Sequence, residues 1–94
     1  MKRHAEDVII DLIIEEARML AEYRAGEYEA DDEKMRFYRY LVYQRAIAAY
    51  GHALHAMGGM AAMDRAIQAI EDKAGMLSMG LVDAAWDGIG SWAG

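Results

Sequence analysis

The sequence predicts an all-α protein, on the strength of three observations. The 94 residues include no proline and are rich in alanine, methionine and glutamate, which favour helix. Hydrophobic residues make up 55% of the chain and charged residues 28%, as in a folded globular domain rather than a disordered segment. Apolar residues also recur with the helical period. We therefore expect a single domain, residues 1–94, with helices at about 5–25, 32–57, 60–74 and 77–92.

The first two predicted helices form a long antiparallel hairpin, and both are apolar around most of their circumference. On helix 5–25 only a narrow stripe is polar. Helix 32–57 has a seam of tyrosines beside a second apolar seam that is rich in alanine. Helices this apolar need neighbours on more than one side. The second seam consists of Met35, Tyr38, Val42, Ala46, Ala49, Ala53 and Ala56.

The last two predicted helices are shorter and are separated by glycines. Breaks fall at Gly58-Gly59 and at Gly75, because glycine commonly ends a helix. Helix 60–74 is amphipathic, with one apolar stripe. Two short amphipathic helices cannot cover both wide faces of the hairpin in this bundle-like arrangement. Uncovered apolar patches mark interfaces, so we expect a homo-oligomer, in its simplest form a two-fold dimer.

Charge is segregated along the chain. Residues 35–57 contain three arginines, two histidines, four tyrosines and no acid, although the net charge of the chain is -6. In one interpretation, the arginines meet Glu22, Glu27 and Glu29 across the turn of the hairpin. In the other, they present a basic-aromatic surface that binds phosphates and stacks on bases. The candidate residues for that surface are Arg36, Arg39, Tyr40, Tyr43 and Arg45.

Glu16 stands in the middle of the apolar arc of the first helix. A hairpin that turns near residue 28 places it opposite about residue 42, within one helical turn of Arg39 and Arg45. We expect Glu16 to be buried and paired with one of these arginines, because an isolated buried carboxylate is costly. A carboxylate in such a place is also a candidate for a perturbed pKa.

Four more residues are candidates for contacts with a partner. His52 and His55 stand three residues apart, a spacing that presents two imidazoles on one side of a helix. Residues 35–57 around them supply no carboxylate ligand, so we expect no metal there and place them near a dimer contact. Trp86 and Trp92 lie on the apolar face of the last predicted helix, which has few charges.

Several classes of function are disfavoured by the sequence. There is no cysteine, so neither a disulfide nor a thiolate zinc site can form. The only serines are Ser78 and Ser91, there is no threonine, and no glycine motif for phosphate is present, so we expect neither an enzyme nor a cofactor. Acidity disfavours direct nucleic-acid binding, and no uncharged run approaches the ~20 residues of a membrane span. We expect a cytoplasmic protein.

These observations favour a non-enzymatic module for protein interaction that acts as an inhibitor or adaptor of a larger protein. In size, acidity and lack of a catalytic motif, the chain is similar to the small anti-defence proteins of bacteriophages, including inhibitors of CRISPR complexes. That resemblance implies a protein partner and no particular site residues. An oligomeric protein that binds an anionic nucleotide is the alternative, and a structural component of a virion is a third possibility.

Overall fold

The structure is a computed structural model that describes residues 2–24 and 33–94. Its elements are α1 (Lys2–Arg24) and α2 (Glu33–Ala85), and no strand occurs in these two ranges. The predicted all-α fold is confirmed. The helix ends predicted at residues 25 and 32, with the turn between them, lie outside the described residues.

Helix α2 is divided by two glycines with non-helical backbone angles. Gly59 has φ 68° and ψ -158°, and Gly75 has φ 90° and ψ 175°. Residues with a side chain rarely adopt positive φ, so these are the two positions where glycine lets the chain change direction. The breaks fall where the sequence predicts them and divide α2 into the segments 33–58, 60–74 and 76–85.

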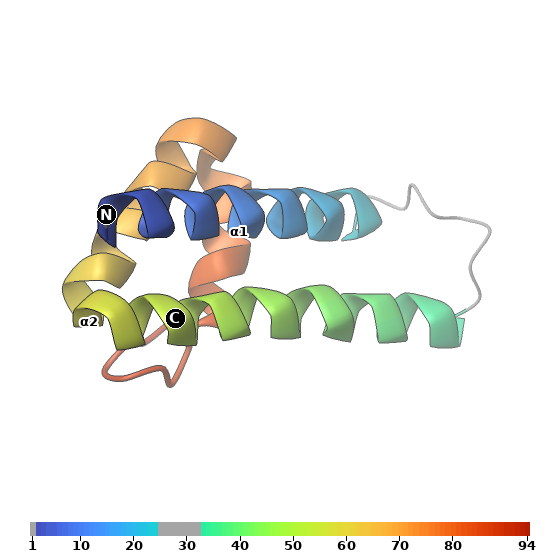
Figure 1. Cartoon of the computed structure of the whole chain (residues 1–94). Coiled ribbons are helices and arrows are strands. Elements are labelled where there is room, and N and C mark those ends of the chain that lie inside the picture. Colours follow the sequence, from blue (N-terminus) through green and yellow to red (C-terminus); the bar gives the residue numbers. More distant parts are fainter. Residues whose placement is uncertain (1, 25–32) are drawn as a thin grey trace.

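The molecule has two layers. Helix α1 and segment 33–58 run side by side in opposite directions, and segments 60–74 and 76–85 lie behind this hairpin (Figure 1). Buried side chains fill the space between the layers, with Ile13, Ile47, Met63 and Trp86 completely inaccessible to solvent. No helix of the described residues covers the opposite side of the hairpin (Figure 1).

The register of the hairpin is fixed near the start of α1. Glu6 is buried, and its carboxylate accepts a hydrogen bond of 3.0 Å from Nη2 of Arg65 in segment 60–74. The same carboxylate oxygen lies 3.3 Å from the position that a Cβ would take on Gly58. Glu6 is therefore opposite Gly58, and in an antiparallel hairpin this places Glu16 opposite about residue 48, not 42 as the sequence predicts.

The last helix ends at Ala85, not at about residue 92 as the sequence predicts. The indole of Trp86 is fully buried, and its Nε1–H donates a hydrogen bond of 3.0 Å to the carbonyl oxygen of Ile47. Beyond it, the N–H of Gly88 donates to the carbonyl oxygen of Trp92 at 3.0 Å, which closes a tight turn. A helical continuation is thus replaced by a turn that packs against segment 33–58.

Candidate functional site

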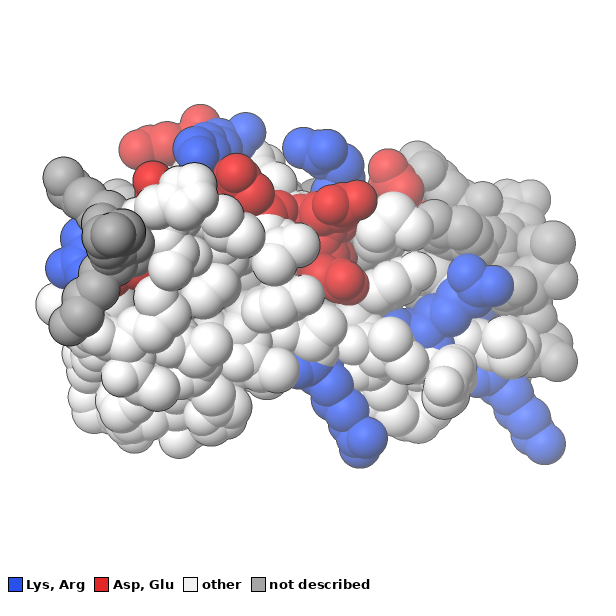
Figure 2. All heavy atoms as spheres, in the orientation of Figure 1, with Lys and Arg blue, Asp and Glu red and all other residues white. Residues whose placement is uncertain are grey.

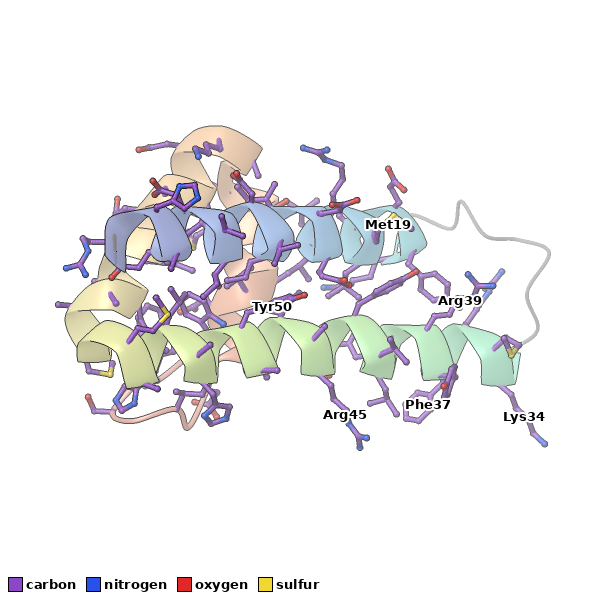
Figure 3. All side chains as sticks on the ribbon, in the orientation of Figure 1. Met19, Lys34, Phe37, Arg39, Arg45 and Tyr50 are labelled. Carbon is purple, nitrogen blue, oxygen red and sulfur yellow. The ribbon has the colours of Figure 1, made fainter. Side chains whose placement is uncertain are left out.

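The predicted basic-aromatic residues of segment 33–58 do not all lie on one side of the helix. Tyr40 and Tyr43 are half-buried and pack against the core. The half-buried Arg39 rises toward α1, whereas the exposed Arg45 points away from it (Figure 3). Arg36 is also exposed. Arg39 and Arg45 therefore lie on different sides of segment 33–58, so one chain does not bring these two arginines together around a single ligand.

In the other interpretation, these arginines form ion pairs with acidic residues across the turn of the hairpin. Two of the three predicted acids, Glu27 and Glu29, lie outside the described residues. The third, Glu22, is half-buried on α1. Pairing across the turn therefore stays a prediction.

Glu16 is half-buried rather than buried. None of the ion pairs within residues 2–24 and 33–94 includes it. The observed register explains this, because Arg39 now lies about 13 Å farther along the hairpin axis than Glu16. Partial burial raises the pKa of Glu16, and the neighbouring charge of Glu15 raises this pKa further. Glu16 thus has a raised pKa and lies apart from the arginine expected beside it.

Glu6 is a buried carboxylate that the sequence predictions do not include. It is only 7% exposed and also lies 3.4 Å from Nε of Arg65. A signal was present in the sequence, because Glu6 begins a series with the alternating spacing of four and three residues that marks a buried helix seam. The other members of this series are Ile10, Ile13, Ala17 and Leu20, all buried.

The two histidines have different surroundings. His52 is exposed on segment 33–58. His55 is half-buried against the C-terminal turn, where its Nε2 lies 2.7 Å from the position that a Cβ would take on Gly90. No three potential ligands among His, Cys, Asp and Glu gather into a metal site in the part of the chain that the structure describes.

The two tryptophans form a pair that holds the C-terminal turn in place. Their ring centroids are 5.1 Å apart and their planes meet at 81°, an edge-to-face arrangement. Trp86 is 0% exposed, and Gly51 gives it room on segment 33–58. The half-buried Trp92 donates from Nε1 to Oδ1 of Asp83 at 2.9 Å. Trp86 therefore belongs to the core and offers no surface to a partner.

A groove lies between the end of α1 and two segments of α2. Its volume is about 290 Å³. Leu20 and Leu81 are buried at its base, whereas Met76 and Leu77 at its rim are 71% and 68% exposed. Arg24 is the single charged residue of this lining. The groove is lined by Leu20, Arg24, Tyr40, Gln44, Met76, Leu77, Gly80, Leu81 and Ala84.

The uncovered side of the hairpin is the second apolar surface, called here the hairpin face. Figure 2 shows much of it uncharged, with acidic side chains along α1 that reach into the face, basic side chains at the opposite edge and further basic side chains above α1. Lys34 and Arg45 point outward at that basic edge (Figure 3). The exposed apolar residues of the hairpin face are Val8 and Leu12 of α1 with Met35, Tyr38, Val42, Ala49 and Ala56 of α2.

Neither helix, over its described residues, has a stretch that is both long and apolar enough to cross a membrane. No protein-family model matches the chain, and the searches of curated proteins and of solved structures gave no match.

Proposed function

We propose that this chain is a non-enzymatic protein-interaction module that docks onto a larger protein as an inhibitor or adaptor. The observation that supports this most is the groove, where Met76 and Leu77 remain more than two-thirds exposed above a buried apolar base. Exposed apolar patches of this kind are typical of binding surfaces. A phage anti-defence inhibitor would act in this way, in the cytoplasm of the producing or infected cell.

The lining of the groove indicates the chemistry of its partner. Leu20 and Leu81 offer a pocket for one apolar side chain, which is how an anchor residue binds at an interface. The guanidinium of Arg24 adds a positive charge that no acid of the lining offsets. The best fit is a partner segment with an apolar anchor and a neighbouring carboxylate, presented on a helix or an extended strand.

Affinity capture from the native host, followed by mass spectrometry, tests this proposal. Leu77→Glu places a charge at the rim of the groove, and because Leu77 is exposed we expect the fold to survive. Gln68→Glu is the matched control, since Gln68 is exposed on segment 60–74 and outside the groove lining. We expect the parent and Gln68→Glu to capture the same protein and Leu77→Glu to lose it. Equal capture by all three would reject the groove as the docking site.

Binding of a small anionic ligand is the second candidate function. It is favoured by the volume of the groove, which is near the lower end of the roughly 300–1,000 Å³ of ligand pockets, and by Arg24 in its lining. Calorimetry against mono-, di- and cyclic nucleotides near physiological ionic strength tests it. Micromolar binding that Arg24→Gln abolishes would place ligand binding ahead of protein docking. No heat of binding for any nucleotide would favour docking.

A further inference from the structure

We infer that the hairpin face binds a second copy of this chain, with a two-fold axis along the helices, so that α1 of each copy lies over segment 33–58 of the other. This inference deepens the proposed interaction function and rests on it, because it names the partner of one of the two apolar surfaces. The hairpin face and the groove lie on different parts of the molecule, so both can be occupied at once.

The first argument is the missing layer. Segments 60–74 and 76–85 cover one side of the hairpin, and the other side has no helix from the described residues (Figure 1). Val8, Leu12, Met35 and Val42 are between 40% and 45% exposed there. Alanines continue the surface along segment 33–58, and Ala49 is exposed. Small residues let another helix approach closely, as in a packed bundle.

The molecule is long enough to offer a dimer interface along the hairpin. It measures 42 × 24 × 21 Å along its principal axes, so one whole side along its length has a projected area on the order of 900 Å². Standard interfaces bury about 800 Å² on each partner. A second hairpin stacked along most of this side would reach that size and form two layers of two helices each.

Charge selects the orientation of the second copy. Acidic side chains are gathered along the α1 edge of the hairpin face, where some basic ones also lie, whereas the edge formed by segment 33–58 carries basic ones (Figure 2). A two-fold axis along the helices places the acidic edge of each copy against the basic edge of the other. An axis across the helices would instead stack α1 on α1, acid against acid, which is unfavourable.

The register specifies which residues meet. Because Glu6 is opposite Gly58, Arg45 is opposite about residue 19 of α1 within one chain. A rotation about an axis along the helices preserves this height, so Arg45 of the second copy comes to lie beside Met19. That level is about one helical turn from Glu15 before it and from Glu22 after it. Each arginine therefore meets carboxylates at the edge, and two-fold symmetry repeats the contact.

Sedimentation equilibrium across a dilution series tests the dimer itself. We expect a mass of twice the 10.5-kDa chain at the upper concentrations. Ala49→Glu, on the hairpin face, should weaken dimerisation at least about a hundredfold, because a charge is placed in an apolar contact. Gln68→Glu, on the other layer, should leave the dissociation constant unchanged. A monomer at every concentration, or a dimer that Ala49→Glu does not weaken, would overturn the inference.

Charge reversal tests the orientation. Glu15→Arg and Arg45→Glu should each raise the dissociation constant about tenfold or more, because each puts like charges together at two symmetric places. The double variant, Glu15→Arg with Arg45→Glu, should recover most of the parent affinity only if α1 lies over segment 33–58 of the other copy. Additive weakening in the double variant would reject this orientation. Both substituted residues are exposed, and circular dichroism of each monomer checks that the fold is kept.

Dimerisation through the hairpin face and docking of a partner in the groove can be tested separately. Leu77→Glu changes the groove and not the hairpin face, so it should lose the host partner while it still dimerises. Ala49→Glu should have the opposite effect: it should still capture the host protein but should no longer dimerise. A chain that captures a host protein but never dimerises would leave the proposed function standing and reject the inference.

Discussion

At the scale of single residues, the buried carboxylate of Glu6 and its arginine make the first prediction. Arg65→Met keeps the apolar stem but leaves Glu6 without its charged partner in a buried position. Because the Arg65 side chain is 50% exposed, we expect a loss of about 1–2 kcal/mol, less than for a fully buried pair. Urea unfolding followed by circular dichroism measures it.

Lys73→Met is the matched control for that substitution. Lys73 lies 3.5 Å from Asp11, and the two side chains are 54% and 69% exposed. Water screens such a pair, so the free energy of unfolding should change by no more than about 0.5 kcal/mol. Equal effects of the two substitutions would show that burial of Glu6 does not matter.

Glu16 gives a second prediction at this scale, on pH dependence. Its pKa is raised in the folded chain, so folding favours the protonated form. The contribution of Glu16 to stability is therefore present below the ordinary carboxyl pKa and is lost as pH rises through its folded value. Glu16→Gln should be more stable than the parent at neutral pH, and the difference should vanish in acid. Unfolding curves at several pH values test this, and a difference independent of pH would contradict it.

At the scale of the elements, the packing of the C-terminal turn on segment 33–58 makes the third prediction. A Cβ on Gly51 would lie 2.5 Å from Nε1 of Trp86, whose position is fixed by its hydrogen bond to Ile47. Gly51→Ala should therefore destabilise the chain by about 1–3 kcal/mol. Gly80→Ala, where a Cβ meets nothing within 4 Å, should instead stabilise its helix by about 0.5–1 kcal/mol. Thermal unfolding distinguishes the two signs.

The boundaries of the helices show what local sequence can and cannot predict. The breaks at Gly59 and Gly75 are local, because glycine permits the backbone angles found there, and they follow from the sequence. The end of the last helix at Ala85 does not, because it depends on Trp86 reaching the carbonyl of Ile47, a residue 39 positions earlier. Apolar periodicity continues through the turn and gives no sign of it.

At the scale of the whole molecule, the register of the hairpin decides which side chains meet. A turn placed near residue 28 predicts Glu16 beside an arginine, whereas contact between Glu6 and Gly58 shifts the pairing by about six residues along the helix. The groove was also beyond prediction, because three segments distant in sequence have to meet to form it. The uncovered apolar side of the hairpin, in contrast, is predictable from the sequence. Both long helices have wide apolar faces, and two short amphipathic helices can cover only one side of the hairpin.

The last prediction concerns how the whole molecule unfolds. If two copies associate through the hairpin face, unfolding is coupled to dissociation, and a higher protein concentration stabilises the folded dimer by mass action. Each tenfold increase contributes about 1.4 kcal/mol, which for a cooperative unit of two chains raises the midpoint temperature by about 3–5 °C. Circular dichroism melts at three concentrations measure this shift in the parent and in Gln68→Glu, which should behave alike. Ala49→Glu should melt at one temperature at all three concentrations, because its monomers unfold independently, and a parent midpoint that does not move would contradict the coupling.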